Sequence, residues 1–199
     1  MEQNLGCHTT QNYRDIFFES NKTSSNVYYV IFICVKPNIG KKLQFWSSLH
    51  EELITHGYDC EKILIVSVMA GVPLELIANH LTENDPQCLK YQLARIMPNT
   101  AMAINAGTIG LYWRPMNHRQ QQQQQCKSSL WTLKLTELLN QLGRCITVDD
   151  EEQIHSIIGV AGSGIAFIYT IIQAMTDGGV AIGLSRKMSR ELVVQTVMV

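Results

Sequence analysis

Apolar residues in this chain occur in two patterns, short unbroken runs and longer segments in which they recur every three or four positions. Unbroken runs rich in β-branched and aromatic residues are typical of strands that are buried on both faces of a parallel sheet. Five such runs are present, near residues 27–35, 63–68, 93–97, 107–112 and 144–148. Because they alternate with segments of helical spacing, they predict an α/β fold built on a parallel sheet.

Three further segments have the apolar spacing of helices. The first, residues 39–57, ends at Gly57 and carries four apolar residues at helical intervals: Leu43, Trp46, Leu49 and Leu53. Pro73 fits the first position of the next helix, where its missing N–H is not needed. The third segment, residues 130–142, stops at Gly143 and is predicted to bury one face. That face consists of Leu130, Leu133, Leu138 and Leu142.

A stretch without charged residues runs from Ile157 to Met175. Its length is close to the ~20 residues that a bilayer requires, so a membrane span is one interpretation. A phosphate-binding glycine loop is a second, but no strand precedes the glycines and no Gly-Lys-Ser/Thr follows them. The third is a helix buried at a subunit interface, which composition favours over the membrane span.

Glycines divide this stretch. Gly162 and Gly164 are predicted to permit close backbone approach or a positive φ. Gly178 and Gly179 are predicted to end the apolar helix. The acidic residues Asp149 to Glu152 precede the stretch, and we expect them to complement the N-terminal dipole of the helix that follows.

Composition excludes several classes of function. The net charge of −1 does not indicate a nucleic-acid or anionic-membrane partner. The six cysteines form no C-x-x-C pair and the histidines do not cluster with them, so we expect free thiols and no metal site. No Ser/His/Asp, Cys/His or paired-carboxylate constellation is visible, and we therefore assign no catalytic residue. No targeting peptide is visible, which predicts a cytoplasmic location, with mitochondria as the alternative.

Several residues follow the predicted strands at the point where an α/β sheet binds ligands. Lys36 comes directly after the first strand, and small residues, Ala70 and Gly71, follow the second. Asn99 and Thr100 stand at the end of the third. Taken alone, Lys36 is more simply a solvated lysine, residues 69–72 an ordinary turn, and Asn99 part of an Asx-type turn that satisfies its own backbone.

Two motifs give these residues a family context. Gly-Ser-Gly-x-Ala-Phe, followed by Ala-Met-Thr-Asp-Gly-Gly-Val-x-x-Gly-Leu, occupies residues 162–184, and Arg-Ile-Met-Pro-Asn-Thr occupies residues 95–100. Together they resemble the pyrroline-5-carboxylate reductase family. The resemblance implies reduction of 1-pyrroline-5-carboxylate to L-proline in proline biosynthesis, with NADPH or NADH as cofactor and homo-oligomerisation through a helical domain.

The resemblance also implies the roles of particular residues. It places the cofactor against Asn21, the segment Cys34, Val35, Lys36 and Pro37, and the segment Val68, Met69, Ala70 and Gly71. It places the substrate near Asn99 and near Glu151, with the acidic residue approaching the ring nitrogen of the substrate. Hydride transfer between rings held face to face needs proximity and orientation more than a strong acid or base.

This chain departs from the family pattern at several places. Ile165 and Ala101 replace prolines, residues 1–30 contain no G-x-G-x-x-G/A motif, and no Ser-Pro-Gly-Gly-Thr sequence follows the helical region. We therefore expect an incomplete NAD(P)-binding Rossmann-like domain over 1–150 and the start of an all-helical dimerisation domain over 151–199. A glutamine-rich loop at 119–126 interrupts the first domain.

Two further hypotheses remain beside an active reductase. One is a catalytically inactive, truncated paralogue that acts only through dimerisation. The other is a small membrane protein anchored by residues 157–175. Because neither composition nor the resemblance favours a membrane, we expect a small-molecule substrate and a second protein chain as the partners of this protein.

Overall fold

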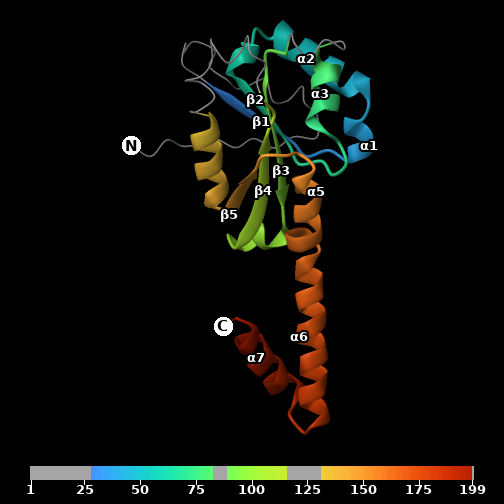
Figure 1. Cartoon of the computed structure of the whole chain (residues 1–199), viewed down its shortest axis with the longest axis vertical. Coiled ribbons are helices and arrows are strands. Elements are labelled where there is room, and N and C mark those ends of the chain that lie inside the picture. The colour runs from blue at the N-terminus through green and yellow to red at the C-terminus, as the bar shows by residue number, and fades with distance from the viewer. Residues whose placement is uncertain (1–27, 83–88, 116–130, 199) are drawn as a thin grey trace.

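The structure, a computed structural model, describes residues 28–82, 89–115 and 131–198. A twisted sheet flanked by helices forms one end of the molecule, and a long helix leads away from it to a short final helix that turns back (Figure 1). Two of the expectations above, the cofactor role of Asn21 and the glutamine-rich loop at 119–126, lie outside the described residues.

The sheet has five strands, which lie side by side in the order in which they occur in the chain. They are β1 (Tyr29–Ile33), β2 (Ile63–Ser67), β3 (Gln92–Pro98), β4 (Gly107–Trp113) and β5 (Gly143–Val148). All five predicted strands are therefore confirmed within a few residues. Their apolar runs pack into two clusters, because successive residues of a strand face opposite sides of the sheet.

The direction of the last two strands differs from the prediction. β1, β2 and β3 are parallel, but β4 runs antiparallel to β3, and β5 is parallel to β4. The connection from β3 to β4 is a short 3₁₀ turn, η4 (Thr100–Ile104), followed by Asn105 in the left-handed conformation with φ 58°. Parallel neighbours need a crossover of about a dozen residues or more, so this short turn returns the chain beside β3 in the opposite direction.

Helices α1 (Pro37–Gly40), α2 (Leu43–Thr55) and α3 (Leu74–Leu81) follow β1 and β2. The predicted helix over 39–57 is thus split, and only three of its four apolar residues are buried: Trp46, Leu49 and Leu53. Leu43 is exposed because it opens α2. Gly57 has φ 73° just after the helix, as expected for a terminating glycine. Pro73 caps α3 rather than occupying its first position.

A helix over residues 131–140 covers the opposite face of the sheet. Its buried residues are Trp131, Leu135 and Leu139, which pack against alternate residues of β2, β3 and β4. The predicted face was therefore displaced: Leu133 is 66% exposed, Leu138 and Leu142 are half-buried, and residue 130 is outside the described residues. Leucines occur all around this helix, so spacing alone did not identify the buried side.

The C-terminal helical unit comprises α5 (Gln153–Ile157), a π-helical turn η5 (Ile158–Gly162), α6 (Gly164–Ala181) and α7 (Arg186–Val197). α5 packs on β4, where a Cβ on Gly110 would meet the side chain of Ile157. α6 then extends away from the sheet (Figure 1).

The glycines of this unit have other roles than those predicted. α6 continues through Gly178 and Gly179 and ends only before Gly183, which has φ 107°. Gly179 is required instead for the contact with α7, because the Ser189 hydroxyl occupies the position where a Cβ would stand. Neither Gly162 nor Gly164 has a positive φ or a close backbone neighbour.

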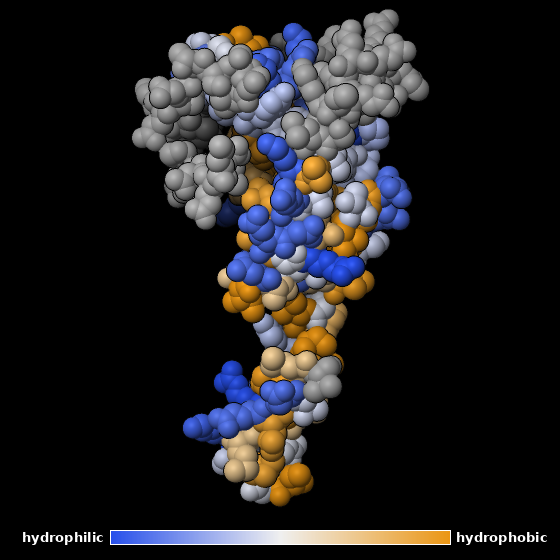
Figure 2. Space-filling view, turned by 90° about the vertical axis from the view of Figure 1, so that its left-hand side faces the viewer, coloured by the Kyte–Doolittle hydropathy of each residue, from blue (hydrophilic) through white to orange (hydrophobic). Residues whose placement is uncertain are grey.

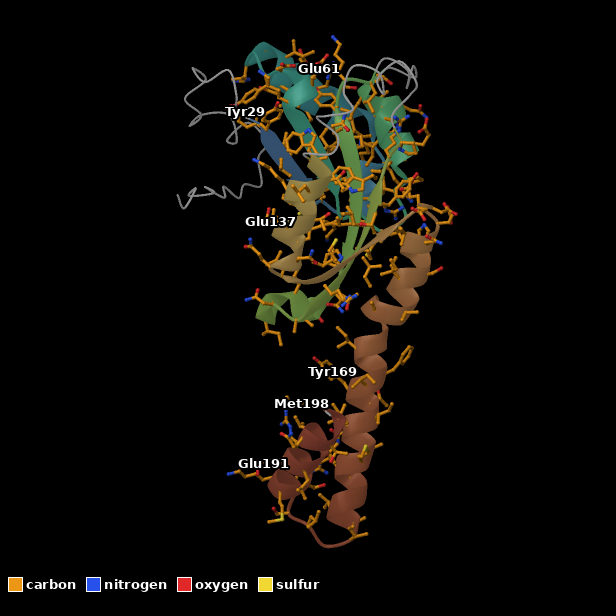
Figure 3. The ribbon with its side chains drawn as sticks, turned by 60° about the vertical axis from the view of Figure 1, so that its left-hand side comes forward. Tyr29, Glu61, Glu137, Tyr169, Glu191 and Met198 are labelled. Carbon is orange, nitrogen blue, oxygen red and sulfur yellow. The ribbon has the colours of Figure 1, made fainter. Side chains whose placement is uncertain are left out.

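Large apolar side chains lie exposed along α6 and α7 (Figure 2). On α6 they are Phe167, Ile168, Tyr169, Ile171 and Met175, and on α7 they are Met188, Leu192, Val194 and Val197. Figure 3 shows Tyr169 projecting from α6 well below the sheet. The helical segment Gln153–Ala181 is long and apolar enough to cross a membrane by length and composition alone, a test that core helices of soluble proteins also pass.

Candidate cofactor and substrate site

The carboxyl ends of the three parallel strands meet at one edge of the sheet, which we call the carboxyl edge. It is formed by residues 34–37 after β1, residues 68–71 after β2, and Asn99 after β3. The first two segments are adjacent, since the Val68 N–H donates to the Ile33 carbonyl at 3.3 Å. Tertiary structure therefore brings together the segments after β1 and β2, as expected for an open α/β sheet, while β3 continues beyond its last pair with β2, Ser67 with Arg95, before it reaches Asn99.

The segment after β1 presents one cation and one thiol. The Lys36 side chain is exposed, while its carbonyl accepts the amides of Ile39 and Gly40 at 2.9 and 3.2 Å and thereby begins α1. Pro37 occupies the first position of α1, and Val35 is half-buried against the core. Cys34 is exposed, but desolvation raises the pKa of its thiol, so the thiol is neutral near pH 7.

The segment after β2 divides into a buried and an exposed half. Met69 is only 1% exposed, and its sulfur packs where a Cβ on Gly40 would stand. Its side chain is therefore part of the core, which argues against a side-chain contact with a cofactor. Ala70 and Gly71 are exposed, Gly71 has φ 66°, and open space surrounds the position of a Cβ on Gly71. The accessible surface here is backbone rather than side chain.

Asn99 joins the sheet to the helical unit. Its Oδ1 accepts the amide of Thr108 at 3.1 Å, and its Nδ2 donates to the Ala161 carbonyl at 3.2 Å. These bonds reach a neighbouring strand and the π-helical turn, so the local Asx-type turn is not the arrangement adopted. Both the oxygen and the nitrogen of the Asn99 side-chain amide are therefore hydrogen-bonded within the protein in this conformation.

Glu151 also bridges two parts of the protein. Its Oε1 lies 2.9 Å from Arg95 Nη1 and accepts the amide of Leu74 at 2.9 Å, while its Oε2 lies 3.2 Å from the same amide. The carboxylate therefore caps the first turn of α3, where an anion is stabilised by the exposed amides and the helix dipole. The prediction that residues 149–152 serve the following helix was wrong for Glu151, although Asp150 accepts the Glu152 amide at 3.1 Å.

Sequence reasoning did not single out the other charged and polar residues around Glu151. Arg95 is buried in β3 and Tyr112 lies beside it in β4. Desolvation, followed by the charges of Glu151 and Asp150, raises the pKa of the Tyr112 hydroxyl. The available signal was a single cation inside the apolar run Leu93 to Ile96, where an unpaired charge would be costly.

Known proteins resemble this chain both in sequence and in structure. Residues 151–199 match the family model described as pyrroline-5-carboxylate reductase dimerisation. A pyrroline-5-carboxylate reductase of Pseudomonas aeruginosa is 35% identical over 135 residues, which are 68% of this chain and 44% of that protein. The Escherichia coli reductase is 29% identical over 185 residues, which are 90% of this chain and 58% of that protein.

Solved structures agree with this relationship. The pyrroline-5-carboxylate reductase of Coxiella burnetii superposes with a TM-score of 0.68 at 26% identity, covering 96% of this chain and 59% of that one. The Plasmodium falciparum enzyme, solved with NADP bound, gives a TM-score of 0.62 at 21% identity over 84% of this chain and 57% of that one. This second similarity concerns the fold alone.

The sheet, its carboxyl edge and the projecting apolar helices define a class of protein, the Rossmann-like α/β proteins that carry a helical dimerisation unit. The sequence comparisons narrow the class further: the chain belongs to the pyrroline-5-carboxylate reductase family. It spans about half the length of the curated relatives it matches.

Proposed function

We propose that this chain takes part in the NAD(P)H-dependent reduction of 1-pyrroline-5-carboxylate to L-proline, the last step of proline biosynthesis. The observation that carries the proposal is the relationship to these reductases across both units, the sheet and the helices.

The carboxyl edge has the features that a nicotinamide cofactor requires. Exposed backbone at Ala70 and Gly71 offers a surface without a projecting Cβ at Gly71, against which a flat ring can lie. Lys36 supplies an exposed cation at the end of the adjacent strand, suited to a phosphate group. NADPH or NADH, when bound, supplies the hydride.

Within this proposal, the residues of the chain bind and orient rather than react. Lys36 and the backbone of residues 68–71 hold the cofactor, and Cys34, Val35 and Pro37 shape the adjacent wall. We assign Asn99 and Glu151 to the substrate side. Glu151 contributes a carboxylate that attracts the cationic nitrogen of a protonated cyclic imine, and Asn99 keeps the π-helical turn against the sheet. Acceleration would then come mainly from proximity and orientation.

The partner that fits the helical unit is a second protein chain. Large apolar side chains are exposed along α6 and, among polar and charged ones, on α7, and such surfaces on soluble proteins are typical of subunit interfaces. We therefore propose homo-oligomerisation through residues 153–199 and a cytoplasmic location. Membrane insertion of Gln153–Ala181 is the competing explanation of the same apolar surface, and fractionation of cells separates the two.

The test combines turnover with cofactor binding. Purified chain is assayed for oxidation of NADPH in the presence of 1-pyrroline-5-carboxylate, and NADPH is titrated by fluorescence. We expect weak binding, with a Kd above the micromolar range, because the sequence contains no glycine fingerprint to hold the pyrophosphate at a helix N-terminus. Micromolar or tighter binding would show that this expectation is wrong.

A pair of lysine variants makes the titration specific to the carboxyl edge. Lys36→Ala should weaken NADPH binding, whereas Lys134→Ala, an exposed lysine on the helix over 131–140 at the other face of the sheet, should leave it unchanged. Equal effects of the two variants would remove Lys36 from the site. Assembly without detectable binding or turnover would instead support the alternative, a paralogue that acts only through dimerisation.

A further inference from the structure

Arg95 is the only charged side chain among the described residues that is buried, with 1% of its surface exposed. It stands in the middle of β3, in register with Ser67 of β2 and Tyr112 of β4. A buried guanidinium is tolerated only where an anion and hydrogen-bond acceptors meet it. The position of Arg95 therefore requires a partner that comes from outside the sheet.

That partner is Glu151, through the 2.9 Å contact between its Oε1 and Arg95 Nη1. Nε and Nη2 of Arg95 have no hydrogen-bond partner in the described part of the chain. No second anion of the described residues shares the guanidinium, so the charge of Arg95 is met by this single carboxylate. Loss of Glu151 would leave a buried cation without compensation.

The same carboxylate accepts the amide of Leu74, the first residue of α3. Leu74 follows the loop that leaves β2, residues 68–73, and the first four residues of this loop belong to the carboxyl edge. Glu151 itself is the first residue of the part of the chain that matches the helical dimerisation unit. Three pieces thus meet at one carboxylate: the centre of the sheet, the end of the loop after β2, and the start of the helical unit.

We propose that Arg95 is a positioning residue: it holds the Glu151 carboxylate against the first turn of α3 and so fixes the loop over 68–73 relative to the helical unit. Val72 and Leu74 also pack in the core, and without Glu151 the amide of Leu74 would lose the acceptor that joins this end of the loop to the helical unit. The positioning of the loop by Arg95 and Glu151 does not depend on the proposed function. The role of that loop, which is to carry the cofactor beside a substrate near Glu151, rests on the proposed function.

A second charged pair supplies a matched control. Arg114 donates to Glu75 Oε2 from Nε and Nη2 at 3.1 and 3.0 Å, and this pair also joins the end of β4 to the first turn of α3. Glu75 is largely exposed, however, and accepts no backbone amide in any contact described here. Removing Arg114 therefore breaks an ion pair on the first turn of α3 but leaves the Glu151 carboxylate in place as acceptor of the Leu74 amide.

The experiment is peptide-resolved amide hydrogen exchange on the full chain without cofactor or substrate. We expect Arg95→Met to accelerate exchange in the first turn of α3 by about fivefold or more, the scale of losing one helix cap. Arg95→Lys should restore most of the protection, because a single ammonium can replace the single Nη1 contact. Arg114→Met should change exchange there less than Arg95→Met, and α2 should keep its protection in all three variants.

The outcomes separate positioning from general stability. Acceleration of similar size in α2 and α3 would mean that Arg95 contributes only to global stability, which would overturn the proposal. Unchanged exchange in a folded Arg95→Met variant would overturn it as well. If that variant does not fold, Glu151→Gln serves instead, because its amide oxygen can still accept from Leu74: faster exchange at α3 with unchanged protection of α2 would show that the cap depends on the carboxylate charge that Arg95 meets, and equal acceleration of both helices would overturn the proposal. None of these results depends on turnover, so failure of the proposed function leaves the test intact.

Discussion

At the scale of single residues, the reactivity of the Cys34 thiol can be used to probe the proposed cofactor site. Cys34 is exposed at the end of β1, next to Lys36, while Cys60 is buried and Cys145 is half-buried. Desolvation raises the pKa of the Cys34 thiol, so its thiolate fraction, and with it the rate of alkylation, should be small near neutral pH and rise in alkaline solution. Its reactivity therefore reports on the surroundings of the carboxyl edge.

The first prediction is that NADPH slows alkylation of Cys34. A ligand on residues 34–37 would cover the thiol, whereas Cys145, on β5, should react at the same rate with and without NADPH. Mass spectrometry of the peptides after iodoacetamide treatment at pH 8.5 measures both rates in one sample. Equal rates for Cys34 at saturating and zero NADPH would place the cofactor elsewhere.

At the scale of elements, the helix over residues 131–140 provides a direct test of packing. Leu135 is 2% exposed against β2, β3 and β4, whereas Leu133 on the same helix is 66% exposed. We predict that Leu135→Ala lowers the free energy of unfolding by about 2–5 kcal/mol, because it removes buried methyl groups and leaves a cavity. Leu133→Ala should change it by less than about 0.5 kcal/mol. Denaturant unfolding of the two variants gives both values, and the reverse order would mean that the helix packs by the face predicted from leucine spacing.

The contact between α6 and α7 provides a second test at this scale. A methyl group at Gly179 would collide with Ser189, whose hydroxyl donates to the Thr176 carbonyl at 2.8 Å. We therefore predict that Gly179→Ala separates α7 from α6 and accelerates hydrogen exchange in both helices. Gly178→Ala is the matched control, since its methyl group would meet nothing within 4 Å and alanine favours a helix by up to ~1 kcal/mol over glycine. The two neighbouring substitutions should change helix protection in opposite directions.

At the scale of the whole molecule, the exposed apolar surface of α6 predicts assembly. Ile168 is 44% exposed and Ile172 is half-buried on the same helix. Burying such groups on a partner contributes on the order of 25 cal/mol per Å² of apolar surface before the costs of ordering. We expect the purified chain to sediment and scatter light as a dimer or larger species at micromolar concentration. A monodisperse monomer would contradict the proposed interface.

Charged variants locate that interface. The combined Ile168→Asp and Ile172→Asp substitutions should yield a monomer whose sheet unit keeps its circular dichroism, because buried carboxylates would oppose association. Leu133→Asp places the same charge on an exposed apolar position of the helix over 131–140 and should leave assembly intact. Assembly that survives the double substitution would mean that the chains meet elsewhere.

The sequence by itself determined the local features of this protein. Unbroken apolar runs gave the positions of β1 to β5, and spacing gave α2 and the existence of the helix over 131–140. Lys36, Ala70 and Asn99 each follow a predicted strand. The prediction of a parallel sheet therefore implied that they lie at the same edge, because the carboxyl ends of parallel strands lie at one edge of the sheet. These features follow from periodicity and turn residues, which depend on a residue and its near neighbours alone. The binding roles of the residues at this edge stay predictions.

Tertiary structure decided what depends on a distant partner. The buried side of the helix over 131–140 was set by packing against the sheet, and α6 continues to Ala181 through Gly179, where it packs against α7. The antiparallel direction of β4 follows from the short connection η4, which the prediction of a parallel sheet did not take into account. Distant partners also set the role of Glu151, whose carboxylate reaches Arg95 and Leu74, 56 and 77 positions away in the sequence. The type of a residue and its spacing from its neighbours, for a charged residue as for a leucine, do not specify which distant group it will contact. Only the folded chain, in which burial makes an unpaired charge costly and an empty contact unfavourable, selects the partner.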